Sequence, residues 1–196
     1  MVEINPTKVA GRWSNGFTLD VHTTSSELIG HDEYGHPQFA SKRSELGELL
    51  YRLKFRRDKS VIPEIAEVVA TFAESYLPKV DLIVPVPPST PRTEQPVILL
   101  ARAIGERIGI PVSEDCVWKV RETSQLKNVF DFDERFQLLD GAFETDRSVV
   151  EAKTILLFDD LYRSGATLNA VTSLLYDQGG ARDVLTLALT RTRRLR

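Results

Sequence analysis

Residues 155–167, with the sequence ILLFDDLYRSGAT, contain four apolar residues, two adjacent acids and a short loop that precedes a helix-like segment. A short apolar run bounded by polar residues is typical of a buried strand. In open α/β sheets, ligands bind in the crevice beyond the carboxyl ends of the strands. The stretch therefore predicts a buried strand that ends in two carboxylates, followed by a phosphate-sized loop at the N-terminus of a helix.

Segments on both sides of this stretch alternate between strand-like and helix-like patterns. Strands separated by helices imply parallel pairing with right-handed crossovers. We therefore predict an α/β, Rossmann-like fold with a mainly parallel sheet flanked by helices. The expected strands are 81–86, 111–120, 153–158 as the central strand and 183–190, and the expected helices are 94–108 and 166–178.

The N-terminal third has a different pattern. Residues 12–22 predict a hairpin with a turn at Asn15-Gly16, and residues 23–40 predict a polar, irregular loop. Leucines at helical spacing predict a helix over 44–56, and Ser60 is the expected N-cap of a second helix. We expect residues 1–60 to form an accessory lobe, or hood, on a core of residues 61–196, the two making a single compact unit.

Composition bounds the functional classes. A chain of 196 residues with 42% hydrophobic and 27% charged residues is ordinary for a globular protein. The formal net charge of -3 makes nucleic acid an unlikely partner, and the lone Cys116 excludes an internal disulfide framework. We find no secretion leader and no apolar run near 18 residues, so we expect a cytoplasmic protein without a membrane partner.

The chemistry of the loop suits an anionic ligand. A helix N-terminus attracts a phosphate, a glycine lets the backbone approach closely, and hydroxyl and guanidinium groups add donors. Asp159 and Asp160 leave the strand on opposite faces and could reach sugar hydroxyls or the hydration shell of a bound Mg²⁺. The simpler alternative is an acidic strand end before a Ser/Thr-capped helix. The candidate phosphate loop comprises Arg163, Ser164, Gly165, Ala166 and Thr167.

This pattern resembles the phosphoribosyl-pyrophosphate (PRPP) signature of type I phosphoribosyltransferases. The resemblance implies that the loop holds the 5'-phosphate of PRPP and that Asp159 and Asp160 hold its ribose. Tyr162 and Arg163 depart from that family's usual small residues, which puts catalytic competence in question more than phosphate binding.

Further segments resemble the ComF branch of that family, over roughly residues 45–192. They are LYRLKFRRD at 50–58, VPVP at 84–87, LLARAIGERIGIPV at 99–112, KVRETSQLKN at 119–128 and DGAFE at 140–144. The cysteine-rich zinc segment of many ComF proteins is absent from this sequence. The chain thus resembles a divergent member of the branch.

The resemblance also implies a pyrophosphate site. A loop after the 81–86 strand would hold pyrophosphate, although a proline-stiffened connection explains the same residues. Basic residues of the 119–128 stretch would cover the leaving group, or else form a solvated strand edge. The pyrophosphate-loop candidates are Pro87, Pro88, Ser89 and Arg92. The candidate catalytic residues are Asp159, Asp160, Arg92, Arg121 and Lys127.

We therefore expect an Mg²⁺-dependent phosphoribosyltransferase that transfers a 5-phosphoribosyl group from PRPP to a nitrogenous acceptor and releases pyrophosphate. A homodimer is expected. Two alternatives stay open, namely a non-catalytic PRPP- or nucleotide-binding regulatory protein and a ComF-like accessory protein of DNA uptake or processing. His31, Asp32 and His36 are interpreted as a polar loop in preference to a metal site, because they match no helical spacing and lack thiolates.

Overall fold

A five-stranded sheet organises the chain, and the computed structural model describes residues 2–88, 93–121 and 137–193. The strands of the sheet, in spatial order, are β1 (Thr7–Lys8), β2 (Asn15–Val21), β9 (Asp183–Arg191), β8 (Thr154–Tyr162) and β5 (Leu82–Pro85). All pairings are parallel except that of β1 with β2. The prediction of an α/β fold with a mainly parallel sheet is confirmed.

The centre of the sheet is β9, so the prediction that 153–158 forms the central strand was wrong. β8 lies between β9 and β5. Seven of the nine residues of β9 are buried, which is the pattern of a strand covered on both faces. β8 also runs further than expected, to Tyr162, so the two acids belong to the strand itself.

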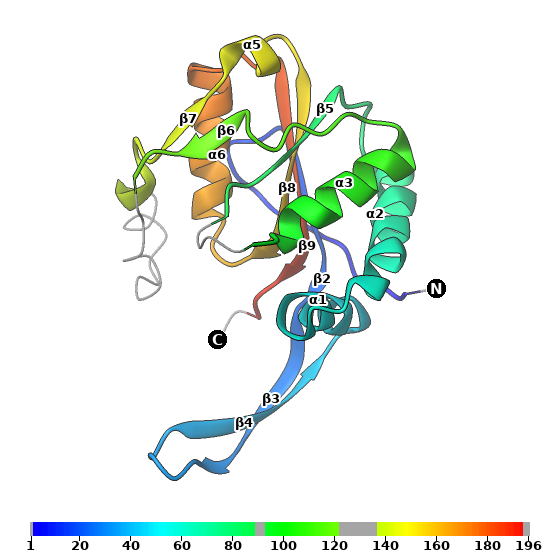
Figure 1. Cartoon of the computed structure of the whole chain (residues 1–196), viewed down its shortest axis with the longest axis vertical. Coiled ribbons are helices and arrows are strands. Elements are labelled where there is room, and N and C mark those ends of the chain that lie inside the picture. The colour runs from blue at the N-terminus through cyan, green and yellow to red at the C-terminus, as the bar shows by residue number, and fades with distance from the viewer. Residues whose placement is uncertain (1, 89–92, 122–136, 194–196) are drawn as a thin grey trace.

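Helices cover both faces of this sheet (Figure 1). The helices are α1 (Glu45–Arg56), the 3₁₀ turn η1 (Lys59–Val61), α2 (Ile62–Tyr76), α3 (Pro96–Ile108), α5 (Arg147–Val150) and α6 (Ala166–Asp177). Leu156 and Phe158 of β8 share one hydrophobic core with α1, α2 and α3. Ile155 and Leu157 share the other core with α6. Alternate residues of β8 thus face different helices.

The Asn15-Gly16 pair is not a hairpin turn, contrary to the sequence prediction. Both residues lie inside β2, which pairs with β9 at Asn15↔Leu185 and Gly16↔Thr186. A Cβ at Gly16 would lie 2.1 Å from Nε1 of Trp13 and 2.5 Å from Oγ1 of Thr186. The glycine therefore serves close packing, which a sequence pattern alone does not distinguish from a turn.

Residues 23–43 form a two-stranded arm, where the sequence predicted an irregular loop for 23–40. β3 (Thr23–His31) pairs antiparallel with β4 (Pro37–Arg43). The arm leaves the sheet at the end of β2 and projects away from the rest of the molecule (Figure 1). Most of its side chains are exposed, so the apolar alternation that marks a half-buried strand is missing.

The helix expected over 44–56 is confirmed as α1, with Ser44 as its N-cap. The expected cap at Ser60 was wrong. Asp58 instead caps η1 by accepting a hydrogen bond of 3.1 Å from the Ser60 N–H. α2 then begins at Ile62, and Pro63 is tolerated in its first turn. In the described part of the chain, no helix is both long and apolar enough to cross a membrane.

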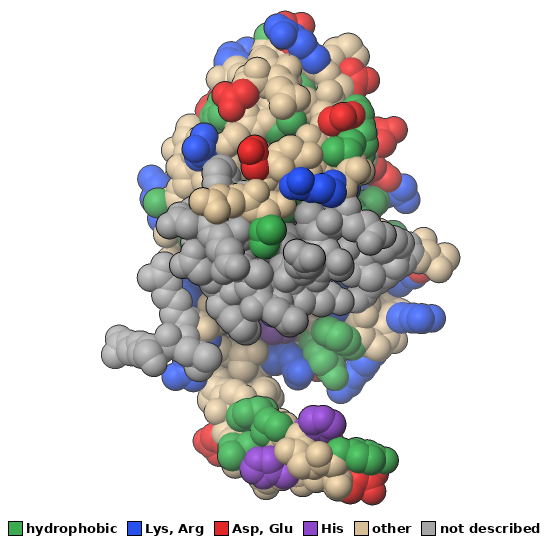
Figure 2. Space-filling model, turned by 90° about the vertical axis from the view of Figure 1, so that its left-hand side faces the viewer, with side chains coloured by type: hydrophobic (Ala, Val, Ile, Leu, Met, Phe, Trp, Pro, Cys, Tyr) green, Lys and Arg blue, Asp and Glu red, His purple; other side chains and the backbone are tan. Residues whose placement is uncertain are grey.

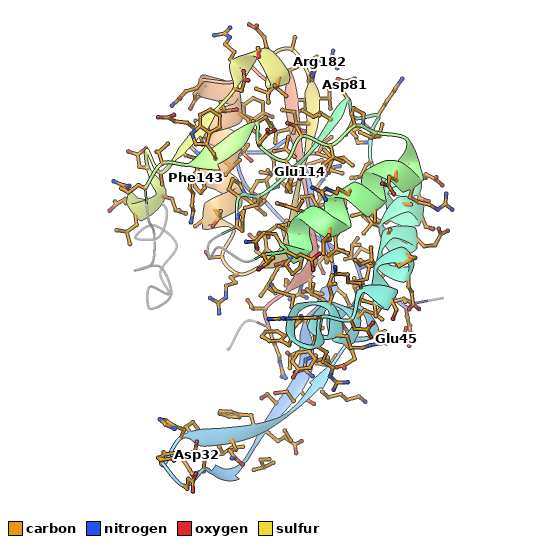
Figure 3. All side chains as sticks on the ribbon, in the orientation of Figure 1. Asp32, Glu45, Asp81, Glu114, Phe143 and Arg182 are labelled. Carbon is orange, nitrogen blue, oxygen red and sulfur yellow. The ribbon has the colours of Figure 1, made fainter. Side chains whose placement is uncertain are left out.

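A second small sheet lies beside α6. β6 (Val117–Lys119) pairs antiparallel with β7 (Phe143–Thr145), so the strand expected within 111–120 is present and occupies 117–119. At the amino ends of the parallel strands, Arg182 binds Asp81 at 2.6 Å, and Figure 3 shows both at the end of the molecule opposite the arm. The carboxyl ends of β2, β8 and β9 therefore face the arm.

α1 is fastened to the end of β2 by backbone contacts. The Ser44 hydroxyl donates to the Val21 carbonyl at 2.6 Å and accepts from the Gly47 N–H at 3.0 Å. A Cβ on Gly47 would lie 2.3 Å from the carbonyl oxygen of His22. The absence of a side chain at Gly47 thus allows the helix to lie directly on the strand.

The contact between Gly47 and the His22 carbonyl predicts the effect of a substitution at Gly47. Gly→Ala inside a helix normally stabilises it by about 1 kcal/mol, but Gly47→Ala should lower the melting temperature because the new methyl group meets the His22 carbonyl. Thermal denaturation followed by circular dichroism measures the change. Glu74→Ala, at an exposed position of α2, is the control for added helix propensity and should not destabilise. A Gly47→Ala protein as stable as the wild type would contradict the contact.

Candidate functional site

The acid pair is divided between the two faces of the sheet, as predicted. Asp159 follows Ile155 and Leu157 on the α6 face, whereas Asp160 follows Leu156 and Phe158 on the α1 face. The two carboxylates therefore have different partners, and the structure distinguishes residues that the sequence treats alike.

Asp159 lies beside the loop that precedes α6. Burial and the adjacent carboxylate of Asp160 raise its pKa from 3.8 to about 7, while the Asp160 N–H and Lys54 act in the opposite direction. The Asp160 N–H donates to Oδ1 of Asp159 at 2.8 Å. Asp159 thus holds a proton far more readily than an ordinary aspartate, and a cation or hydroxyl donors beside it would favour its charged form.

Asp160 is bound by a cation from the N-terminal third of the chain. Nζ of Lys54, on α1, lies 2.9 Å from Oδ2 of Asp160, and their side chains are 20% and 15% exposed. The Thr190 hydroxyl donates to the Asp160 carbonyl at 3.3 Å and contacts Nδ1 of His22 at 3.2 Å. Burial, Arg43 and Lys54 lower the pKa of His22. Asp160 is therefore neutralised from within the protein.

The loop after β8 presents the start of α6 without a side-chain cap. Gly165 is the N-cap residue and has a φ of 78°, in the left-handed region. The carbonyl of Gly165 accepts from both the backbone and the side-chain amide of Asn169, each at 2.9 Å. Gly165 has no side chain with which to cap the helix, so N–H groups of the first turn can donate to an anion.

Tyr162 packs beneath this loop. A Cβ on Gly165 would lie 2.6 Å from the Tyr162 hydroxyl oxygen and 2.9 Å from its ring, so only glycine fits there. The Tyr162 hydroxyl also donates to the Ser164 carbonyl at 3.5 Å, and the Ser164 hydroxyl accepts from the Ala166 N–H at 3.4 Å. Tyr162 therefore shapes the loop, while the Arg163 side chain is exposed.

A small cavity brings Asp159 and the loop together. Asp159 and residues 161–168 line it, and its volume is about 60 Å³. All five predicted phosphate-loop residues line the same cavity as Asp159, whereas Asp160 does not line it.

The predicted pyrophosphate side is described only in part. Pro87 and Pro88 follow β5 after one residue, Val86, at the carboxyl edge of the sheet. Arg121 donates to the carbonyls of Leu138 and Asp140 at 3.0 and 2.7 Å, so its described contacts bind it to the chain before β7. The candidates that fall outside the described residues are Ser89, Arg92 and Lys127.

The acidic side chains near the cavity decide how the expected Mg²⁺ could bind. The described residues contain no group of three or more His, Cys, Asp or Glu side chains that could hold a metal ion. Mg²⁺ commonly keeps several waters and binds through one or two carboxylates plus substrate phosphates. Asp159 fits an Mg²⁺ ion that arrives with a phosphate ligand, because a cation would offset the repulsion between Asp159 and the adjacent carboxylate of Asp160. Asp160 already has Lys54 as its countercharge.

Sequence reasoning missed three residues of this site. Lys54 lies 106 positions from Asp160, so no local pattern joins them. His22 comes at the end of a strand that was interpreted as a hairpin. Asn169 is buried on α6, accepts from the Arg12 N–H at 2.8 Å and fastens the loop. A polar residue on the apolar face of a predicted helix was the available signal for Asn169.

The raised pKa of Asp159 predicts a pH-dependent stability. Between pH 4 and 7, Asp159 keeps a proton in the folded protein that it has lost in the unfolded chain. The free energy of unfolding therefore falls as the pH rises toward 7. Asp159→Asn should therefore raise the melting temperature more at pH 8 than at pH 5. A gain of ~1 kcal/mol in the free energy of unfolding corresponds to roughly 2–4 °C for a chain of this size. Melting curves across this range, in the absence of divalent cations, measure it, with Asp177→Asn on α6 as the control for the change of side chain. An equal effect of Asp159→Asn at both pH values would contradict the assignment.

The Lys54–Asp160 ion pair predicts a double-mutant cycle. Lys54→Met leaves a half-buried carboxylate unpaired and should cost about 2 kcal/mol, less than the ~3–5 kcal/mol of fully buried pairs. Lys54→Met combined with Asp160→Asn should cost less than the sum of the two single changes. Urea denaturation measures all four proteins. Arg147→Met, which removes an exposed ion pair with Glu151, is the matched control and should change little. Additive effects would show that the pair is not coupled.

The chain is similar in sequence to a curated protein. No protein-family model matches the chain. The competence protein ComFC of Bacillus subtilis (strain 168) is 31% identical over 146 residues, which are 74% of this chain and 59% of that protein. The chain thus spans about three fifths of the length of this curated relative.

The chain is also similar to solved structures. The glutamine PRPP amidotransferase of B. subtilis, complexed with ADP and GMP, superposes with a TM-score of 0.50 at 20% identity, over 80% of this chain and 34% of that one. The adenine phosphoribosyltransferase of Thermoanaerobacter pseudethanolicus gives a TM-score of 0.47 at 16% identity, over 85% and 95% of the two chains. The superposition on the amidotransferase shows a shared α/β fold, and the similarity to ComFC confirms the ComF-like resemblance stated from the sequence.

Proposed function

We propose that this ComF-like relative of the type I phosphoribosyltransferases transfers a 5-phosphoribosyl group from PRPP to a nitrogenous acceptor and releases pyrophosphate. The observation that supports the proposal best is the cavity that Asp159 shares with the start of α6, where the N-cap residue is a glycine. A helix N-terminus suits the 5'-phosphate, and a carboxylate beside it suits the ribose hydroxyls of the same ligand. One compact site would thus accept both ends of a ribose phosphate.

The proposed chemistry depends on positioning and electrostatics. N–H groups of the loop and the Ser164 and Thr167 hydroxyls would hold the phosphate, and Tyr162 would keep the loop in shape. As pyrophosphate leaves, positive charge develops on the anomeric carbon, and the carboxylate of Asp159 would stabilise it. Mg²⁺, when bound with PRPP, would neutralise the pyrophosphate oxygens. Arg92, Arg121 and Lys127 stay candidates for the same task.

The acceptor site is proposed for the part of residues 1–60 that lies outside the central sheet, namely the arm and α1. The arm and α1 both lie at the carboxyl edge of the sheet, and α1 reaches the acid pair through Lys54. An acceptor between the hood and the Asp159 cavity would approach the anomeric carbon directly. In this proposal the N-terminal elements bind the acceptor, and the loop before α6 binds the sugar phosphate.

A non-catalytic PRPP- or nucleotide-binding role is the second candidate. The observation that favours it is the Lys54–Asp160 ion pair, because a carboxylate already neutralised inside the protein is less available to ligand or cation. In this case the cavity would bind the sugar phosphate and the protein would respond without turnover. Binding and turnover must therefore be measured separately.

Calorimetric titration with PRPP and Mg²⁺ tests the binding step. Gly165→Val should weaken PRPP binding at least tenfold, because the new side chain meets Tyr162 and strains a φ of 78°. Gly109→Val is the matched control, since Gly109 has a φ of 70° but open space around its Cβ position. Equal affinities of Gly165→Val and the wild type would place the phosphate elsewhere.

Pyrophosphate release, assayed across candidate nucleobases with PRPP and Mg²⁺, tests turnover. Release that Asp159→Asn reduces at least tenfold would support the transferase. Binding of PRPP without release for any acceptor would favour the regulatory role. Absence of PRPP binding, together with single-stranded DNA binding that weakens steeply with salt, would favour a DNA-processing accessory role.

A further inference from the structure

The tip of the arm, residues 27–39, exposes large apolar side chains. Leu28, Ile29, Tyr34 and Phe39 are 57%, 65%, 77% and 54% exposed. Figure 2 shows that apolar and histidine side chains gather at this end, separated from the body of the molecule. Two-stranded ribbons without further cover are marginally stable in water. Contact with another apolar surface would therefore stabilise the arm tip.

The tip is held in a defined shape before any contact forms. Oδ1 of Asp32 accepts from the N–H groups of Tyr34 and His36 at 2.9 and 2.8 Å, and Figure 3 shows Asp32 at the end of the arm. Leu28 lies directly opposite Phe39 in the ladder, so their side chains share one face. This ordering lowers the entropy lost when the tip docks.

The charge of the tip narrows the choice of partner. Residues 27–39 contain the three acids Glu27, Asp32 and Glu33, and no Lys or Arg. Asp32 is engaged by the turn, which leaves Glu27 and Glu33 as exposed charges. An apolar surface flanked by carboxylates fits a partner surface that is apolar and basic.

This chain carries such a surface at the end of α1, which we name the α1 patch and define as Phe55, Arg56 and Arg57. All three side chains are exposed, and Phe55 is 63% exposed. Among the described residues, no ion pair engages Arg56 or Arg57, whereas Arg52, Lys54 and Lys59 are each paired with an acid. The α1 patch therefore has cations available to carboxylates.

We propose that the arm tip of one molecule docks on the α1 patch of a second copy of this chain, in a two-fold symmetric dimer. A strand the length of β3 spans about 30 Å, and Figure 1 shows the tip pointing away from its own α1, so the contact forms between molecules. In a two-fold dimer each arm meets the other copy's patch, so the contact forms twice. The proposal does not rest on the proposed reaction.

Sedimentation velocity at micromolar concentrations tests the dimer. The wild type should have twice the 22.1 kDa mass of one chain. Glu27→Lys with Glu33→Lys should raise the dissociation constant at least tenfold, and so should Arg56→Glu with Arg57→Glu. All four changes together restore opposite charges and should restore the dimer. Leu28→Ser with Phe39→Ser should also give monomers.

Tyr76→Ser, which removes an exposed aromatic ring from α2, is the control and should leave the dimer intact. Circular dichroism checks that every variant is folded, which we expect because the mutated side chains are all exposed. A monomeric wild type, or a dimer that survives the arm changes, overturns the proposal. Disruption by the arm changes without rescue in the fourfold variant overturns the assignment of the α1 patch.

Discussion

Neighbouring residues of a β-strand cannot place their side chains on the same face, and this constraint governs the whole site. Asp159 and Asp160 adjoin in sequence, so one faces α6 and the other faces α1. The first shares a cavity with the loop that precedes α6, and the second is bound by Lys54. The ion pair of Asp160 and the raised pKa of Asp159 both reflect this division.

The local part of the site could be predicted from sequence. A buried strand, an acid pair and a glycine-containing loop before a helix are contiguous in the chain, and each has its own pattern of residue types. The opposite orientation of the acids followed from strand geometry alone. The carboxyl-edge position of the loop followed from the alternation of strands and helices.

Features that depend on distant parts of the chain were not predictable in this way. Nothing near Lys54 in sequence points to Asp160, and the Gly16 pattern of a turn is also the pattern of a strand with a close neighbour. The arm escaped detection because it has no buried face, so its apolar residues lack the usual alternation. In each case tertiary packing gives the residue its role.

The position of β9 has a consequence for how the protein is made. β9 comes after every other strand in the sequence, yet β2 and β8 are joined only through it. During synthesis, the apolar faces of β2 and β8 must wait for the last strand before they can pair. Long-range parallel pairing of this kind is slow and leaves hydrophobic surface exposed. The apolar edges of β2 and β8 therefore stay without their partner until β9 has been made.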